Sequence, residues 1–174
     1  MNPQLKTYIP SATIRNKVKI LADRISNDYK DKDLLLIGIL NGSFVFLADL
    51  IREIQIPIQV DTIAATSYGN GTVSSGKVEI TKKLSIDPQG KNIILVEDII
   101  ETGNTLQAIT EYLQTLEVQS VQICSLLVKR KEGSKTMAAD YIRFEIEDRF
   151  VVGYGLDYAG SYRNLPYIAE LKFI

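Results

Sequence analysis

The chain has 174 residues, of which 45% are hydrophobic and 24% charged, and its formal net charge is −1, so we expect residues 1–174 to form a single globular domain. A chain this close to neutral lacks the basic excess that attracts a phosphate backbone, which argues against a nucleic-acid partner. Histidine is absent, which excludes His-based catalytic triads and His-ligated metal sites.

Nothing in the sequence indicates contact with a membrane. No apolar run approaches the roughly 20 residues that a membrane-spanning helix requires, and the first residues do not resemble a signal peptide. The single cysteine, Cys124, lies in an apolar run and cannot form an internal disulfide. We therefore expect a cytoplasmic protein.

The first part of the chain alternates between helical and extended patterns. Apolar side chains at three- and four-residue spacing predict an amphipathic helix over 12–30. The aliphatic run 34–40 predicts a buried strand, followed by an Asn-Gly-Ser turn, a helix over 44–54 and a second strand over 58–65. Helices that alternate with apolar strands indicate an α/β fold with a mostly parallel sheet.

The composition changes over residues 66–84, which we interpret as a flexible hairpin. Residues 67–77 are polar and rich in glycine, and Val78 and Ile80 then alternate with polar residues. Such a hairpin would project from the sheet as a lid over a nearby site. The same composition is also typical of a connection with no role.

The most informative segment lies in the middle of the chain. Residues 92–96 predict a buried parallel strand, with Glu97 and Asp98 at its carboxyl end, and a helix is expected over about 105–116. The loop between them carries hydroxyl groups and a glycine, and the backbone N–H groups at a helix N-terminus suit a phosphate. Carboxylates beside a phosphate repel it unless ribose hydroxyls or Mg²⁺ lie between them, so this segment predicts a sugar-phosphate site.

The remaining segments complete the sheet pattern. Residues 121–128 predict a strand that ends at the basic residue Lys129. The apolar groups 144–146 and 150–152 are expected to close the sheet region.

Residues 95–106, Leu-Val-Glu-Asp-Ile-Ile-Glu-Thr-Gly-Asn-Thr-Leu, resemble the phosphoribosyl pyrophosphate motif of the type I phosphoribosyltransferases. The Val-Lys-Arg run at 128–130 and the run Phe-Val-Val-Gly-Tyr-Gly-Leu-Asp at 150–157 are similar to further elements of the hypoxanthine-guanine phosphoribosyltransferases. The resemblance covers 35–163. It implies the type I phosphoribosyltransferase fold, with a mostly parallel central sheet flanked by helices, a small hood formed from the chain ends and a flexible hairpin lid.

The resemblance also implies an activity. A member of this family would be a purine salvage transferase that converts hypoxanthine, and with it guanine, plus 5-phosphoribosyl 1-pyrophosphate to IMP or GMP plus pyrophosphate. It would depend on Mg²⁺ as its cofactor. Its partners would be the small-molecule substrates, a 6-oxopurine base and phosphoribosyl pyrophosphate, and the chain would assemble as a homodimer or homotetramer.

By resemblance, the ribose and its 5′-phosphate would be held by the residues of the motif: Glu97, Asp98, Thr102, Gly103, Asn104 and Thr105. Glu101 would be the catalytic residue that accepts the proton from N7 of the purine. The family normally has an aspartate at this position, so the chain departs from the pattern by one methylene group. Read alone, Glu101 would be a solvated loop carboxylate.

By resemblance, pyrophosphate would be bound by a turn with a non-proline cis peptide and by an arginine: Leu40, Asn41, Gly42 and Arg163. Many relatives have a lysine where this chain has Asn41, which leaves more of the binding to Mg²⁺, backbone amides and Arg163. Ser67 and Tyr68 match the lid, whose closure would exclude water.

The purine would be bound by four residues of the later motifs: Lys129, Phe150, Val151 and Asp157. In the family the lysine donates to O6, which selects 6-oxopurines because adenine has no acceptor there. Phe150 would stack on the base, although by itself it reads as a core residue. Mg²⁺ would be held by Asp157 on the pyrophosphate side and by Glu97 and Asp98 on the ribose side.

Two alternatives to this function remain open from the sequence. The first is a transferase for xanthine or for a pyrimidine, although Lys129 and Phe150 argue against a pyrimidine. The second is a non-catalytic RNA-binding regulator on the same fold. That protein would need a basic face, which a net charge of −1 disfavours.

Overall fold

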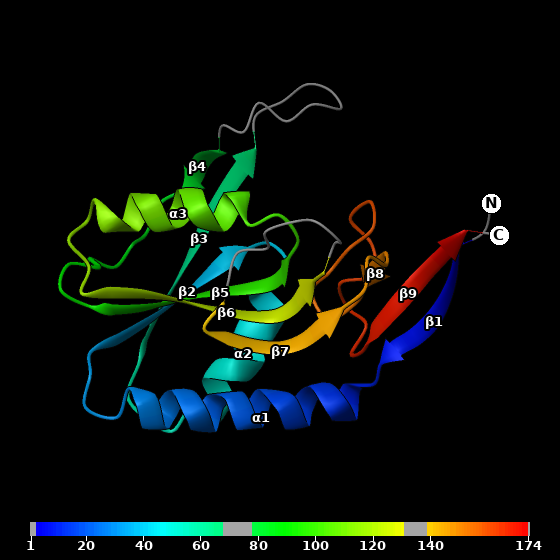
Figure 1. Ribbon diagram of the computed structural model, residues 1–174, viewed down its shortest axis with the longest axis horizontal. Helices are drawn as coiled ribbons and strands as arrows, with labels where there is room; N and C mark the ends of the chain where they lie inside the picture. The colour runs from blue at the N-terminus through cyan, green and yellow to red at the C-terminus, as the bar shows by residue number, and fades with distance from the viewer. Residues whose placement is uncertain (1–2, 68–77, 131–138, 174) are drawn as a thin grey trace.

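A computed structural model describes residues 3–67, 78–130 and 139–173 of the chain (Figure 1). Within these residues the strands form a larger, six-stranded sheet and a smaller, three-stranded sheet. The elements in chain order are β1 Pro3–Ile9, α1 Ser11–Asp28, β2 Leu34–Leu40, α2 Phe44–Glu53, β3 Gln59–Ser67, β4 Val78–Lys82, β5 Asn92–Ile100, α3 Asn104–Gln114, β6 Ser120–Lys129, β7 Tyr141–Ile146, β8 Val151–Val152 and β9 Ile168–Phe173.

The larger sheet has the strand order β4-β3-β2-β5-β6-β7, and β4 alone pairs antiparallel to its neighbour. In Figure 1, α3 covers one face of this sheet, and α1 and α2 cover the other. The prediction of a mostly parallel sheet flanked by helices is confirmed. The helices expected over 12–30 and 44–54, and the strand expected over 34–40, all lie within two residues of their observed bounds.

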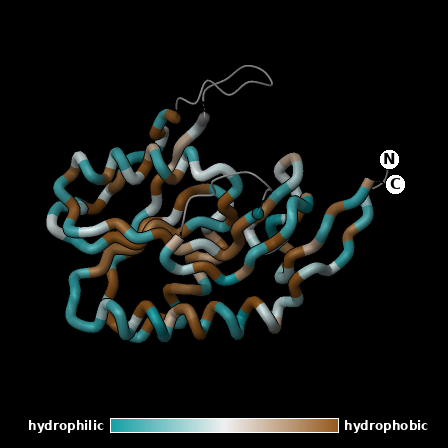
Figure 2. Tube along the Cα trace, in the orientation of Figure 1, coloured by the Kyte–Doolittle hydropathy of each residue, from teal (hydrophilic) through white to brown (hydrophobic). Residues whose placement is uncertain are grey.

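Alternate residues of the central strands pack into different layers of the core. Leu34 and Leu36 of β2 belong to the apolar cluster beneath α1 and α2, whereas Leu35 and Ile37 belong to the cluster beneath α3. Burial on both faces explains why β2 is aliphatic throughout instead of alternating with polar residues. Figure 2 shows the same contrast, with continuous brown along the central strands and alternating brown and teal along α1.

The smaller sheet joins the two ends of the chain. Strand β1 pairs antiparallel with β9, from Pro3 opposite Phe173 onward, and β9 pairs with β8. Figure 1 shows the two termini side by side at the tip of this sheet. The expectation that residues 150–152 close the same sheet as 144–146 is therefore wrong. An apolar run shows that a segment is extended, but its partner strand here lies at the far end of the chain.

Strands β3 and β4 pair antiparallel where a hairpin was expected, with Ala64 opposite Lys82 and Ser67 opposite Val78. The connection between them, including Tyr68, lies outside the described residues. The interpretation of this hairpin as a lid stays a prediction.

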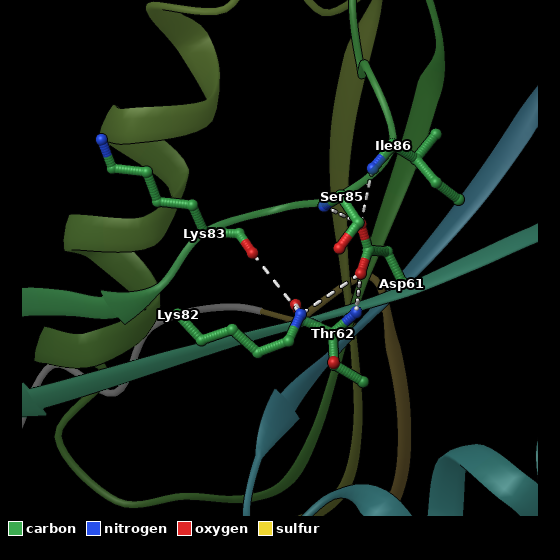
Figure 3. Close-up of polar contacts among 6 residues, drawn as sticks. All are labelled: Asp61, Thr62, Lys82, Lys83, Ser85 and Ile86. Carbon is green, nitrogen blue, oxygen red and sulfur yellow. Dashed lines mark hydrogen bonds and ion pairs between the residues drawn. The ribbon is translucent and has the colours of Figure 1, made fainter.

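The segment after β4 is attached to β3 by one carboxylate (Figure 3). The side chain of Asp61 is 7% exposed and accepts hydrogen bonds from the backbone N–H groups of Thr62 at 2.7 Å, Ser85 at 2.6 Å and Ile86 at 2.9 Å. The ammonium group of Lys82 lies 3.4 Å from the same carboxylate. These contacts hold the antiparallel edge strand and the chain that leaves it against the parallel part of the sheet.

This carboxylate predicts an acid-sensitive contribution to stability. Burial opposes ionisation, but the three backbone donors and Lys82 outweigh it, so the pKa of Asp61 is lowered. Because the pKa of Asp61 is lower in the native state than the value of about 4 in the unfolded state, ionised Asp61 stabilises the fold above pH 4. This stabilisation is lost as the pH falls through the native pKa. We expect Asp61→Asn to reduce the free energy of unfolding at pH 7 by about 1–3 kcal/mol, and the gap to wild type to narrow below pH 4.

Urea denaturation at pH 7 and at successively lower pH measures this effect. Asp33→Asn is the matched control, because Asp33 is 61% exposed and its carboxylate lies 2.8 Å from the ammonium of Lys91. A surface pair of this kind contributes less than about 1 kcal/mol. A loss at Asp61 no larger than the loss at Asp33 would show that the buried contacts do not stabilise the fold.

Candidate active site

The carboxyl end of β5 leads into a loop and then into helix α3. Gly103 has φ of +81°, a left-handed conformation that glycine adopts without steric cost, and α3 begins at the next residue. The loop and the first turn of α3 border a cavity of about 350 Å³. Predicted site residues that line this cavity are Leu40, Gly42, Glu97, Glu101, Thr102, Gly103, Asn104 and Thr105. Free N–H groups at the start of α3 make this cavity suitable for a phosphate.

A second cavity of about 310 Å³ lies beside the first. Predicted site residues that line it are Gly42, Asp98, Glu101, Lys129, Phe150, Val151, Asp157 and Arg163. Gly42, Ile99 and Glu101 line both cavities, so the two are neighbouring parts of one site. Residues that the motifs placed far apart in the sequence are thus brought together around a continuous depression.

Some predicted residues fall outside this arrangement, and others were missed. Asn41 does not line either cavity, and the side chain of Ser67 is not described. Ile99 lines both cavities, but an isoleucine in a strand reads as a core residue, so no sequence pattern distinguished it as a site residue. Leu156 was missed for the same reason.

Strand β5 continues to Ile100, beyond the expected end at Val96. Its last residues keep their pairing with β6, where Glu97 lies opposite Ser125 and Ile100 opposite Val128. The placement of Glu97 and Asp98 after the strand is therefore wrong, because both lie within it. Burial raises the pKa of the Glu97 carboxyl well above its usual range, and the adjacent Asp98 raises it further.

The turn after β2 packs directly on Asp98. The peptide bond between Leu40 and Asn41 is cis, as the resemblance implied. The Cα of Gly42 approaches the Asp98 carboxylate so closely that a Cβ there would lie 1.9 Å from Oδ2. Asp98 itself is only 7% exposed. The position of the turn and the position of the Asp98 carboxylate therefore depend on each other.

Lys129 and Glu101 both line the second cavity and form an ion pair with each other. The Lys129 side chain is 10% exposed and ends strand β6, whereas the Glu101 side chain is 45% exposed at the end of β5. Asp148 is a more distant neighbour, with its Oδ1 atom 3.9 Å from the Lys129 ammonium. A buried donor and a half-exposed acceptor thus lie side by side in the wall of the cavity.

Phe150 stands in the wall of the second cavity and is not a core residue, because 48% of it is exposed. Its ring packs edge to face against Tyr158, with centroids 5.6 Å apart, and Tyr158 packs in turn on Phe173. Its carbonyl accepts a hydrogen bond from the N–H of Leu171 at 2.9 Å. About half of Phe150 therefore remains accessible in the cavity wall.

Asp157 and Arg163 also line this cavity and contact each other. The guanidinium of Arg163 lies 2.6 Å from Asp157 Oδ1 and donates to the carbonyl of Gly155 at 2.5 Å. The other oxygen of Asp157 accepts from the N–H of Gly160 at 2.8 Å. Both side chains are therefore held in place by contacts within their own segment.

The acidic side chains of the site do not by themselves form a complete set of ligands for a metal ion. Among the described residues, no group of three or more Asp, Glu, Cys or His side chains could hold a metal ion. Mg²⁺, however, is usually bound by one or two carboxylates together with waters and substrate phosphates. Asp98 and Asp157 line the same cavity and supply carboxylates of this kind. The donor set therefore fits a magnesium ion that arrives with a phosphorylated substrate.

The fold and this site define a class of protein. Residues 10–159 match the phosphoribosyl transferase domain, and the chain belongs to the phosphoribosyltransferase family. It is 42% identical to the hypoxanthine phosphoribosyltransferase of Salmonella typhimurium, over 100% of this chain and 99% of that protein. It is 44% identical to the hypoxanthine-guanine phosphoribosyltransferase of Bacillus subtilis, over 96% and 93%.

Solved structures show the same relationship. A hypoxanthine phosphoribosyltransferase from Staphylococcus aureus superposes with a TM-score of 0.91 at 42% identity, covering 96% of this chain and 91% of that one. A hypoxanthine-guanine phosphoribosyltransferase from Bacillus anthracis superposes with a TM-score of 0.90 at 40% identity, covering 99% and 100%. The resemblance to the hypoxanthine-guanine phosphoribosyltransferases is confirmed. No helix in the described ranges is long and apolar enough to span a membrane.

Proposed function

We propose that this chain transfers the phosphoribosyl group of phosphoribosyl pyrophosphate to hypoxanthine and to guanine, giving IMP or GMP and pyrophosphate. The observation that carries the proposal is the Lys129–Glu101 pair beside Phe150, in a cavity continuous with the loop at the start of α3. A base and a sugar phosphate bound in these two cavities would meet at the residues that the cavities share.

The Lys129–Glu101 pair matches one edge of a 6-oxopurine. The carbonyl O6 accepts a hydrogen bond and the neighbouring N7–H donates one, so this edge of the base would pair with the ammonium of Lys129 and the carboxylate of Glu101 in place of their ion pair. Adenine carries an amino group at the same place, which cannot accept a hydrogen bond from Lys129. Phe150 offers a face on which the ring system stacks.

The sugar phosphate would occupy the first cavity. Backbone N–H groups at the start of α3, with the hydroxyls of Thr102 and Thr105, would hold the 5′-phosphate. Glu97 and Asp98 would face the ribose hydroxyls. With both substrates fixed, the anomeric C–O bond to pyrophosphate breaks while a C–N bond to the base forms, and Glu101 removes the N7 proton.

Pyrophosphate would leave toward Arg163, Asp157 and the turn at Leu40, Asn41 and Gly42. Mg²⁺, when bound with the substrate by Asp98 and Asp157, supplies positive charge that offsets the charge developing on pyrophosphate. The hairpin containing Ser67 and Tyr68 would close over the site as a lid. A cytoplasmic location and assembly as a homodimer or homotetramer belong to the same proposal.

One assay tests the proposed reaction directly. The protein is incubated with phosphoribosyl pyrophosphate, Mg²⁺ and either hypoxanthine, guanine, xanthine or uracil, and the products are separated by chromatography. We expect IMP and GMP from the first two bases, and loss of both products when EDTA removes the metal.

The same assay decides against the alternatives or for them. Faster turnover of xanthine or uracil would favour the transferases for those bases. Absence of a nucleoside monophosphate from both hypoxanthine and guanine would refute the proposal. A salt-dependent mobility shift with RNA in such an inactive protein would favour the RNA-binding regulator.

A further inference from the structure

A buried tyrosine links the two segments that border the proposed pyrophosphate position. Tyr154 is 4% exposed, and its hydroxyl donates to Asp49 Oδ2 at 2.6 Å. Asp49 lies in α2, the helix that begins directly after the turn at 41–43. Tyr154 lies in the segment that leads to Asp157 and Arg163. The hydrogen bond therefore spans 105 positions of the sequence to connect one side of the site with the other.

The backbone around Tyr154 fixes the direction of its side chain. Tyr154 has φ of +52°, a left-handed conformation that few non-glycine residues adopt. Its N–H donates to the carbonyl of Leu165 at 2.8 Å, and the N–H of Gly155 donates to the carbonyl of Arg163 at 3.1 Å. The segment thus folds back on itself, and the tyrosine side chain is the group that extends from it to α2.

The segment that contains Tyr154 also packs directly on the turn at 41–43, because Gly155 and Gly42 meet there through their backbones. A Cβ at Gly155 would lie 2.1 Å from the carbonyl oxygen of Gly42. Gly42 in turn packs on Asp98. A shift of the segment relative to α2 would therefore be transmitted to the turn and to the carboxylate beneath it.

Asp49 is held from its other side as well. Its Oδ1 atom accepts a hydrogen bond from Arg52, one turn later on α2. One oxygen is thus engaged by its own helix and the other by Tyr154. The Asp49 carboxylate is thus bound to its own helix as well as to Tyr154.

We propose that the Tyr154–Asp49 hydrogen bond is a positioning contact that sets the distance between Arg163 and the turn at 40–43, and so determines affinity for the pyrophosphate group. This inference rests on the proposed function. Two of the residues assigned to the base are held by other contacts, since Lys129 ends β6 and the carbonyl of Phe150 accepts a hydrogen bond from Leu171 of β9. The contact should therefore affect phosphoribosyl pyrophosphate and leave the base largely unaffected.

Tyr154→Phe removes the hydroxyl and keeps the ring. Tyr141→Phe is the matched control, because Tyr141 is 2% exposed and its hydroxyl donates to Asp28 on α1 at 2.9 Å, outside both cavities. Each variant deletes one buried hydroxyl and the hydrogen bond that this hydroxyl donates to a helix carboxylate. We expect similar losses of Tm from the two variants, because the deleted contacts are alike.

Only Tyr154→Phe should alter pyrophosphate recognition. We expect it to raise the KM for phosphoribosyl pyrophosphate, and the Kd for magnesium pyrophosphate measured by calorimetry, by about 5- to 30-fold. The KM for hypoxanthine should stay within about twofold of wild type. Asp49→Asn keeps a neutral acceptor for the tyrosine, so it should give an intermediate increase in the KM for phosphoribosyl pyrophosphate and in the Kd for magnesium pyrophosphate. This variant replaces Tyr154→Phe in the test if Tyr154→Phe does not fold.

Equal effects of Tyr154→Phe and Tyr141→Phe on pyrophosphate binding would overturn the inference, as would a rise in the KM for hypoxanthine as large as that for phosphoribosyl pyrophosphate. The calorimetric titration separates this inference from the proposed function. A wild-type protein that forms no IMP or GMP refutes the reaction, while the difference between the two variants in binding magnesium pyrophosphate still decides the positioning role. Wild-type protein that does not bind magnesium pyrophosphate also overturns the inference.

Discussion

Replacement of Glu101 by Gln is expected to lower the turnover number with hypoxanthine by about 100-fold or more, the usual contribution of a positioned general base. Gln retains the size of the side chain but cannot accept a proton. The KM for phosphoribosyl pyrophosphate should change little, because in the proposed function Glu101 accepts a proton from the base, whereas the loop at the start of α3 holds the sugar phosphate. Steady-state kinetics with each substrate varied in turn measure both quantities.

Two further variants make the result specific. Glu101→Asp keeps the carboxylate and restores the residue that is usual in the family, so it should retain most of the activity. Glu145 lies on the edge strand β7 and forms an exposed ion pair with Arg130. Glu145→Gln breaks this ion pair and should not alter turnover. If Glu101→Gln turns over hypoxanthine as fast as wild type, the carboxylate is not the proton acceptor and its ion pair with Lys129 is only structural.

A single methyl group at Gly42 is expected to disable the site. A Cβ at this position would lie 1.9 Å from Asp98 Oδ2 and 2.8 Å from Oδ1, distances that real Cβ atoms do not tolerate. Asp98 is 7% exposed and lines the second cavity, so any movement of its carboxylate changes the site itself. Either the turn or the carboxylate must shift, and a displacement on the order of 1 Å costs about 100-fold in rate. We expect kcat/KM to fall by at least this factor in Gly42→Ala.

The comparison variant for this experiment is Gly90→Ala. No atom lies within 4 Å of a Cβ at Gly90, which lines neither cavity, but its φ of +70° makes alanine unfavourable there. Gly42 has no positive φ. Gly90→Ala is therefore destabilised by backbone strain alone, and Gly42→Ala by the steric clash alone. Kinetics and thermal unfolding of both variants separate the two effects. Activity of Gly42→Ala within a few fold of wild type would show that the close approach is not required.

Local patterns were sufficient to predict the elements that the motifs occupy. Residues 34–40 are buried on both faces and therefore aliphatic, and α1 and α2 carry the apolar spacing of helices covered on one side. The start of a helix after Gly103 was also predicted, and the assignment of this loop to a phosphate stays a prediction that depends on the free N–H groups there. Such features depend on neighbours a few residues away, which the sequence shows directly.

Contacts between distant segments were not visible in the sequence. Nothing in Val151 or Val152 indicates pairing with β9 instead of β7, and no motif connects Tyr154 with Asp49. Asp61 reads as an ordinary strand-edge acid until three backbone donors converge on it. These contacts join segments that are distant in the sequence, and their partners are selected by packing and by the need to satisfy buried polar groups.

The amino-acid sequence by itself determined the class of fold, the family and the identity of the groups that would perform the chemistry. Side-chain type and short-range spacing are enough for that, since a phosphate loop, a stacking ring and a carboxylate keep their properties wherever they occur. Only the tertiary structure decided that the two cavities adjoin, that Glu101 and Lys129 face each other as an ion pair, and that Gly42 packs on Asp98. These relations are distances between elements, and distances are set by the packing of α2, β5, β6 and the smaller sheet against one another.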